Sequence, residues 1–152
     1  MTPDLPRLVQ LGKLIRICYA DDFLSAPGRF NFPGLGYDRA AILYADDVDG
    51  TKPYGFLLRD QTTGETVVPL RGTEGFWEWA EDGQAVLVDC PFFPPGCHIE
   101  QGFARIYATL RDGNNVPLKQ RAAALRRPLT VTGHSLGAAL APSGPPISIR
   151  LK

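Results

Sequence analysis

Five consecutive residues, Gly133-His134-Ser135-Leu136-Gly137, carry the chemistry that this sequence indicates most clearly. They fit the pattern G-x-S-x-G, in which a serine stands on a sharp turn between a strand and a helix. A serine hydroxyl is a useful nucleophile only when it is exposed, held rigidly and paired with a base. The two glycines leave room for the close backbone approach of such a turn. Ser135 is therefore predicted to be a catalytic nucleophile for acyl transfer, and the alternative is an ordinary turn serine.

The residues on either side of the pentapeptide predict the elements that such a turn needs. The β-branched stretch 128–132 predicts a strand, and the Ala/Leu-rich stretch from Ser135 predicts the start of a helix. The N–H groups at that helix start would face the point where an oxyanion develops, and the N–H of Leu136 is the expected donor. We expect His134 to be structural, because a base must approach Ser135 Oγ from across the site.

The rest of the chain alternates expected helices and strands. Residues 54–59 and 66–70 flank a polar turn that contains Gly64, which predicts a hairpin. We find no internal repeat and no linker, so residues 1–152 are expected to form one α/β domain in which 142–152 is an atypical tail. The other expected elements are helices at about 5–22, 99–110 and 116–127, strands at 40–44 and 86–88, and loops at 25–37 and 91–96.

Composition and charge restrict the class of protein. Hydrophobic residues make up 44% and charged residues 21%, with 16 basic and 16 acidic side chains, which is typical of a folded chain. Zero net charge argues against nucleic acid or an anionic membrane as a partner attracted by bulk charge, but leaves apolar contact with a lipid interface open. The start of the sequence lacks a secretory signal, which slightly favours the cytoplasm over secretion after removal of a signal.

The three cysteines are too few for a disulfide scaffold. We expect all three, Cys18, Cys90 and Cys97, to be reduced, the alternative being a short loop closed between Cys90 and Cys97.

Three segments resemble the class 3 (fungal-type) lipase family. Residues 133–140 are similar to its nucleophile motif, 70–73 (Leu-Arg-Gly-Thr) to its R-G-[ST] oxyanion segment, and 79–82 (Trp-Ala-Glu-Asp) to its W-x-x-D. The resemblance implies that Thr73 stabilises the oxyanion through its backbone N–H and its hydroxyl. It also implies that Asp82 orients the Thr73 hydroxyl by a hydrogen bond.

The same resemblance implies a fold and an activity. The fold would be a partial α/β-hydrolase, with a central mixed sheet, flanking helices and its C-terminal part missing. The activity would be hydrolysis of carboxylic esters of the triacylglycerol lipase or esterase type, with no metal and no cofactor. The segment between Thr73 and Asp82 corresponds to the family's lid, and its aromatic residues would meet lipid or, alternatively, pack in the core. The sequence departs from the family's H-x-G-F segment, since Glu100 stands where histidine is expected.

The other two members of a catalytic triad do not follow Ser135. Their order in this fold type is serine, then an acid, then histidine, yet residues 136–152 contain no Asp, Glu or His. We therefore expect a truncated family member whose hydrolysis is impaired, with His98 as the alternative base. Two other hypotheses remain, a catalytically dead remnant that binds lipid or a partner, and half of a site that another chain completes.

The short tail also bears on assembly. If residues 147–151 do not cover the edge of the strand at 129–132, that edge is open to pairing with other chains. Homo-oligomers through this edge are the expected consequence.

Overall fold

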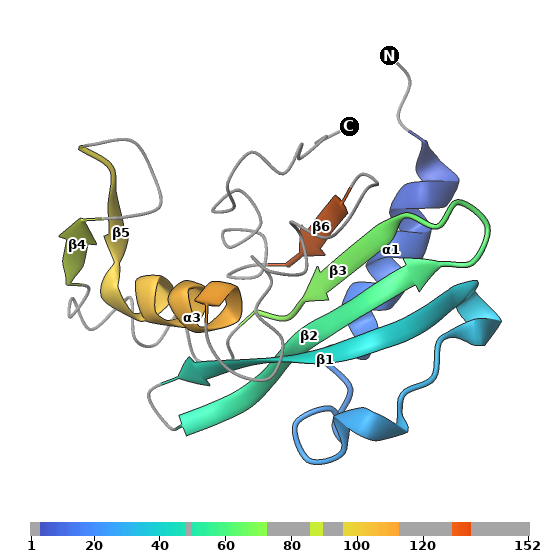
Figure 1. The fold of residues 1–152 in the computed structure, drawn as a ribbon, viewed down its shortest axis with the longest axis horizontal. Helices are drawn as coiled ribbons and strands as arrows, with labels where there is room; N and C mark the ends of the chain where they lie inside the picture. The colour runs from blue at the N-terminus through green and yellow to red at the C-terminus, as the bar shows by residue number, and fades with distance from the viewer. Residues whose placement is uncertain (1–3, 48–49, 73–85, 90–95, 113–128, 135–152) are drawn as a thin grey trace.

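The computed structural model describes residues 4–47, 50–72, 86–89, 96–112 and 129–134 (Figure 1). The expected helix at 116–127 and most of the expected loop at 91–96 lie outside these ranges. The elements in chain order are α1 (Leu5–Ile17), the short 3-10 turns η1 (Pro27–Arg29) and η2 (Pro33–Leu35), β1 (Tyr37–Asp47), β2 (Gly50–Asp60), β3 (Thr66–Leu70), β4 (Leu87–Asp89), β5 (His98–Glu100), α3 (Gln101–Asp112) and β6 (Leu129–Gly133).

The main sheet is mixed, as expected. Its strand order is β1-β2-β3-β6. β2 is antiparallel to both of its neighbours, β1 and β3, whereas β6 is parallel to β3. The hairpin predicted around residues 60–65 is present as β2 and β3. The Asp60 carboxylate accepts hydrogen bonds from the N–H groups of Thr62 and Thr63, at 2.9 and 2.8 Å, and so stabilises the turn. β6 is an edge strand of the described sheet, and residues 147–151, which were expected to decide whether that edge is covered, are outside the described part.

α1 ends earlier than the periodicity predicted. The Asp4 side chain accepts the N–H of Arg7 at 3.1 Å and caps the first turn. The helix ends at Ile17 instead of about residue 22, because the N–H groups of Cys18 and Tyr19 bond carbonyls only three residues back. The chain then turns away from the helix axis, which leaves Tyr19 free to reach other segments.

α3 begins later than predicted, at Gln101 instead of residue 99. Residues 98–100 form β5, which pairs with β4 in a separate antiparallel sheet. The Glu100 carboxylate accepts the N–H groups of Gly102 and Phe103, at 2.7 and 3.0 Å, and so caps the helix. The glutamate that replaces the family's expected histidine therefore has a structural role here.

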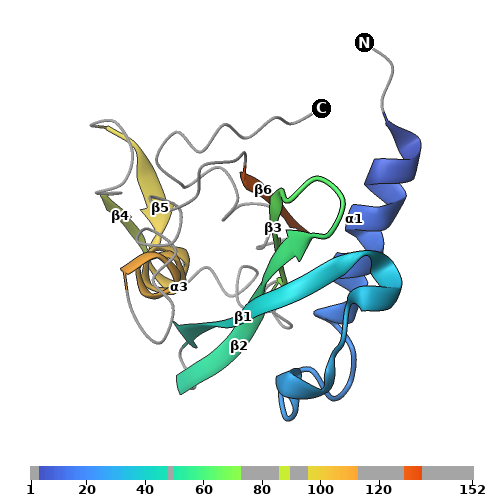
Figure 2. The ribbon, with the colours of Figure 1, turned by 45° about the vertical axis from the view of Figure 1, so that its right-hand side comes forward.

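Both faces of the main sheet are buried, which fixes the layers of the fold. Figure 2 shows α1 on one side of the strands and α3 on the other. Neighbouring residues of one strand contribute to opposite clusters, as Leu57 and Leu58 do, because side chains alternate along a strand. The cluster on the α3 side contains Leu43, Ala45, Tyr54, Leu57, Val68, Leu70, Ile106, Tyr107, Leu110 and Leu129. The cluster on the α1 side contains Leu14, Cys18, Phe23, Phe32, Tyr37, Phe56, Leu58 and Val67.

Within the described ranges, no helix has the length and apolar character needed to span a bilayer. The two cysteines that these ranges include, Cys18 and Cys97, are both free thiols. Cys90, the other member of the alternative loop, is outside them.

Candidate active site

The parallel pairing of β3 with β6 brings two of the recognised segments together. Its register runs from Thr66 opposite Leu129 to Leu70 opposite Gly133. Both strands therefore end at the same edge of the sheet, where Arg71 and Gly72 follow β3 and His134 follows β6 (Figure 1). The oxyanion segment and the nucleophile segment, some sixty positions apart in the sequence, thus leave the sheet side by side.

The hydroxyl of Tyr19 connects these two chain segments. It accepts a hydrogen bond from the N–H of Gly72 at 2.7 Å. The same hydroxyl lies 3.4 Å from both the backbone oxygen and Nδ1 of His134. Its single hydrogen can be donated to the backbone oxygen of His134 while its oxygen accepts from Gly72, and the role of Nδ1 depends on the imidazole tautomer. The aromatic rings of Tyr19 and His134 meet edge to face, with centroids 6.0 Å apart.

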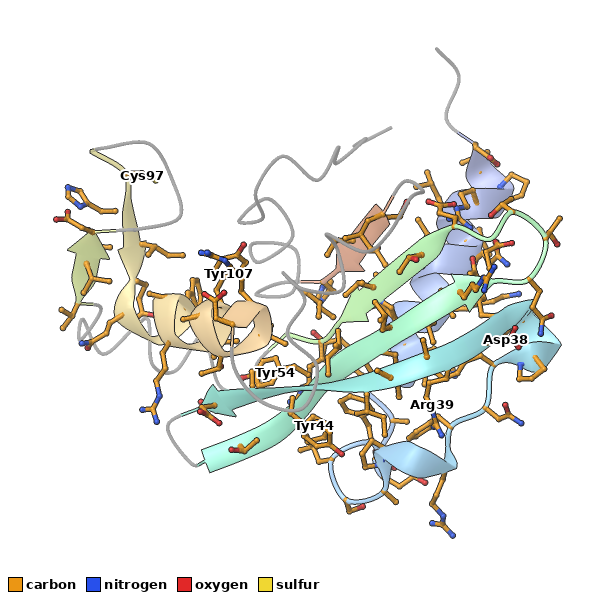
Figure 3. All side chains as sticks on the ribbon, in the orientation of Figure 1. Asp38, Arg39, Tyr44, Tyr54, Cys97 and Tyr107 are labelled. Atoms are coloured by element: carbon orange, nitrogen blue, oxygen red, sulfur yellow. The ribbon has the colours of Figure 1, made fainter. Side chains whose placement is uncertain are left out.

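Arg71 holds the segment that leads to Thr73. Its side chain is buried, and its Nε donates to the carbonyl oxygen of Gly72 at 2.9 Å. Its backbone N–H donates to the carbonyl of Tyr54 at 2.8 Å, and its guanidinium carbon lies 5.8 Å from the centroid of the Tyr54 ring. Figure 3 labels Tyr54 on β2, where its hydroxyl donates to Asp47 Oδ2 at 2.9 Å. The backbone up to Gly72 is therefore fixed on both sides.

Cys18 lies close to this arrangement but is not a second nucleophile. Its thiol is buried and contacts the carbonyl oxygens of Leu14 and Pro69, at 3.7 and 3.8 Å. Burial raises the pKa of Cys18 to about 12, against a smaller lowering by the charge of Arg71. The thiol therefore stays protonated and unreactive near neutral pH.

The four site residues that the sequence predicted lie outside the described part of the chain. Thr73 directly follows Gly72 and Ser135 directly follows His134, while Leu136 and Asp82 are further from the described ends. Phe76, Trp77 and Trp79, the aromatic residues of the segment expected to correspond to the lid, are also outside the described part. The roles of all these residues stay predictions, and what the structure describes is the scaffold that ends at them.

His98, the alternative base, belongs to a different part of the fold. Its Nδ1 lies 3.0 Å from Oδ1 of Asp89, in the exposed β4–β5 hairpin. Figures 1 and 2 both place this hairpin and α1 at opposite sides of the molecule. Among the contacts of the described residues, none links His98 with Tyr19, Gly72 or His134. In those ranges there is likewise no group of three or more His, Cys, Asp or Glu that could hold a metal ion.

Sequence reasoning missed two residues of this scaffold. Tyr19 was included in the expected helix, and its contacts lie 53 and 115 positions further along the chain, so no local pattern could have revealed them. Arg71 was recognised as part of a motif, but its bond to the Gly72 carbonyl was not anticipated. The signal that could have indicated this bond was the position of Arg71 directly before Gly72.

The comparisons with known proteins agree with this geometry. The chain matches the family model described as Lipase (class 3) over residues 67–142, and it belongs to that family. The comparison with curated proteins finds no match. The fold is that of the α/β-hydrolase lipases in part, which confirms the expected fold class.

Solved lipase structures share this fold at low sequence identity. The mono- and diacylglycerol lipase from Aspergillus oryzae is 23% identical with a TM-score of 0.67, over 93% of this chain and 55% of that one. A triacylglycerol lipase with a serine protease triad as its catalytic centre is 19% identical with a TM-score of 0.66, over 93% and 53%. The lipase from Rhizopus microsporus var. chinensis is 21% identical with a TM-score of 0.64, over 93% and 50%. The chain thus spans about half the length of these lipases.

Proposed function

We propose that this chain contributes the nucleophile and the oxyanion hole of a carboxylic ester hydrolase of the triacylglycerol lipase type. Ser135 is the nucleophile, and the N–H groups of Thr73 and Leu136 are the oxyanion donors. Asp82 accepts a hydrogen bond from the Thr73 hydroxyl and so orients it. The observation that carries this proposal is the parallel β3–β6 pair, whose last residues, Leu70 and Gly133, stand three positions before Thr73 and two positions before Ser135.

The proposed reaction is acyl transfer in two steps. Ser135 Oγ attacks the carbonyl carbon of the ester and loses its proton to a base, while the carbonyl oxygen takes up negative charge. Backbone N–H groups that already face that oxygen stabilise the tetrahedral intermediate. The intermediate then expels the alcohol, which takes the proton, and leaves an acyl-serine that water hydrolyses. Acylglycerols are the proposed substrates because the similar solved structures include lipases named for them.

These 152 residues offer no acid or histidine after Ser135 to complete the triad. We therefore expect them to hydrolyse even activated esters slowly by themselves. In a serine protease, the loss of triad members leaves roughly 10³- to 10⁴-fold catalysis over water. For this chain alone we accordingly expect slow turnover of p-nitrophenyl butyrate. If turnover becomes faster when a polypeptide that carries the base is added, the site is one that another chain completes.

A fluorophosphonate probe tests the nucleophile separately from turnover. We expect slow, covalent labelling of the wild type, none of Ser135→Ala, and unchanged labelling of Ser25→Ala, because Ser25 lies in an exposed turn after α1. A wild type that stays unlabelled would contradict Ser135 as nucleophile and favour a remnant that only binds lipid or a partner. Turnover at ordinary enzyme rates, abolished by Ser135→Ala, would instead contradict the expected impairment, and His98→Ala would then test the alternative base.

A further inference from the structure

α1 has two apolar faces, and the fold uses only one of them. The inner face packs against the cluster on the α1 side of the sheet through Leu11, Leu14 and Ile17. It also carries polar contacts, since Arg7 bonds Tyr37 and Glu65, and Gln10 Nε2 donates to the carbonyl of Leu35 at 3.1 Å. At 100° per residue, six exposed residues fall within an arc of about 140° on the opposite side of the helix. This outer face consists of Leu5, Leu8, Val9, Gly12, Lys13 and Arg16.

The outer face of α1 is not an ordinary solvent-facing surface. Leu5, Leu8 and Val9 are 64%, 44% and 58% exposed. Surface helices usually turn charged and polar side chains of mixed character to water. The exposed residues of α3 follow that rule, since they are Gln101, Arg105 and Asp112. The outer face of α1 carries three large apolar side chains, two cations, and no acidic side chain.

The charge of α1 identifies the kind of surface that fits it. Residues 5–17 contain three basic and no acidic side chains, whereas the whole chain has 16 of each. Although the net charge of the whole chain is zero, the side chains of α1 carry a net positive charge. Arg7 points inward to Glu65, at 2.7 Å, so Lys13 and Arg16 are the cations of the outer face. A second copy of the same face would offer these cations no anion, whereas an anionic lipid surface offers both anions and an apolar layer.

Figure 2 shows α1 at the margin of the molecule, with β3 and β6 on its inner side. A helix in that position can lie flat on a surface without moving the sheet. We propose that the outer face of α1 docks on an anionic lipid surface, with Leu5, Leu8 and Val9 entering the acyl region and Lys13 and Arg16 meeting the headgroups. The proposed contact involves residues of α1 alone, and it requires no catalytic step.

Co-sedimentation with vesicles tests the proposal on the chain as it is. We expect binding to an equimolar mixture of phosphatidylcholine and phosphatidylglycerol, and weak or no binding to phosphatidylcholine alone. The double variant Lys13→Gln/Arg16→Gln should lower the partition coefficient on the anionic vesicles about 30-fold at low salt. The variant Leu5→Gln/Val9→Gln should lower it at least about tenfold, through loss of apolar insertion.

Matched controls separate the helix face from general charge and hydrophobicity. Arg105→Gln removes an exposed cation from α3, and Leu87→Gln removes an apolar side chain that is 66% exposed on β4. Both should bind the anionic vesicles as the wild type does, and circular dichroism should show every variant folded. Equal binding to the two kinds of vesicle, no binding to either, or equal losses in the controls would overturn the proposal. So would a dimer in light scattering that Leu5→Gln/Val9→Gln separates while vesicle binding is absent.

Discussion

At the scale of single residues, one hydroxyl group joins two segments that the sequence keeps far apart. The Tyr19 hydroxyl accepts the N–H of Gly72 at 2.7 Å and lies 3.4 Å from both the backbone oxygen and Nδ1 of His134. Tyr19→Phe removes the hydroxyl and leaves the N–H of Gly72 without this partner. We expect the free energy of unfolding in urea to fall by about 1 kcal/mol, with an unchanged slope. If Ser135 is the nucleophile, its labelling by a fluorophosphonate should also slow.

Tyr44→Phe is the matched control for that variant. Tyr44 is half-buried, and its hydroxyl has no hydrogen-bond partner within the described ranges. The same atomic change should therefore alter the unfolding free energy by less than about 0.5 kcal/mol. Equal losses in the two variants would mean that the Tyr19 hydroxyl contributes nothing specific.

Cys18 gives a residue-scale prediction about alkaline pH. Burial raises its pKa from 9.0 to about 12, so folding favours the neutral thiol. The stability from this preference is complete below pH 9 and is lost as the pH rises towards 12, at up to about 1.4 kcal/mol per unit. Between about pH 8 and about pH 10.5, wild type should therefore lose about 2 kcal/mol relative to Cys18→Ala. Urea unfolding at both pH values measures this, and parallel losses in the two proteins would contradict the raised pKa.

At the scale of elements, the contact between β2 and β3 depends on a glycine. Gly55 pairs with Leu70, and a Cβ added at Gly55 would lie 2.1 Å from the backbone oxygen of Pro69. That atom belongs to the strand backbone and cannot move alone. Gly55→Ala should therefore separate the strands next to Arg71 and cost about 3 kcal/mol of unfolding free energy.

Gly12→Ala makes the same atomic change where space is available. Gly12 lies within α1, and nothing comes within 4 Å of an added Cβ. Because alanine favours helix over glycine, this variant should gain about 0.5–1 kcal/mol. Thermal unfolding compares the two, and a Gly55→Ala protein as stable as wild type would show that β2 and β3 are not held this closely.

At the scale of the whole molecule, one arginine links elements from the beginning of the sequence with elements much further along it. From α1, Arg7 donates to the Tyr37 hydroxyl at 2.7 Å and pairs with Glu65 at 2.7 Å and Asp60 at 3.6 Å. Glu65 also accepts a hydrogen bond from the Thr130 hydroxyl on β6. These groups are mostly shielded from water, so removal of Arg7 leaves acceptors without their charged donor.

Arg7→Met should accordingly lower the free energy of unfolding by about 2 kcal/mol. Arg29→Met is the control, because Arg29 and Asp22 are exposed and 3.8 Å apart, and such pairs contribute between about 0 and 1 kcal/mol. Chemical denaturation of both variants measures these two losses in unfolding free energy. A loss in Arg29→Met as large as that in Arg7→Met would place the effect in general surface charge and not in this network.

Much of the local structure could be predicted from the sequence. The hairpin around residues 60–65 and the strands at 66–70 and 129–133 follow from alternation, β-branched residues and turn chemistry, which act between near neighbours. The family was also recognisable, because its nucleophile and oxyanion motifs are short contiguous runs, and the family match over 67–142 confirms it. The roles of Ser135, Thr73, Leu136 and Asp82 follow from those runs and stay predictions.

Only the tertiary structure decided which segments meet. β3 pairs with β6, and the paired residues Thr66 and Leu129 are more than sixty positions apart. Burial of both faces of the sheet selects β6 as the neighbour of β3, and the pattern of neither strand alone does so. The same holds for the end of α1 at Ile17, the start of α3 after β5, and the reach of Tyr19 to Gly72 and His134. Local propensity sets which elements can form, whereas long-range packing sets where they stop and what they touch, because contacts between distant residues depend on the whole fold.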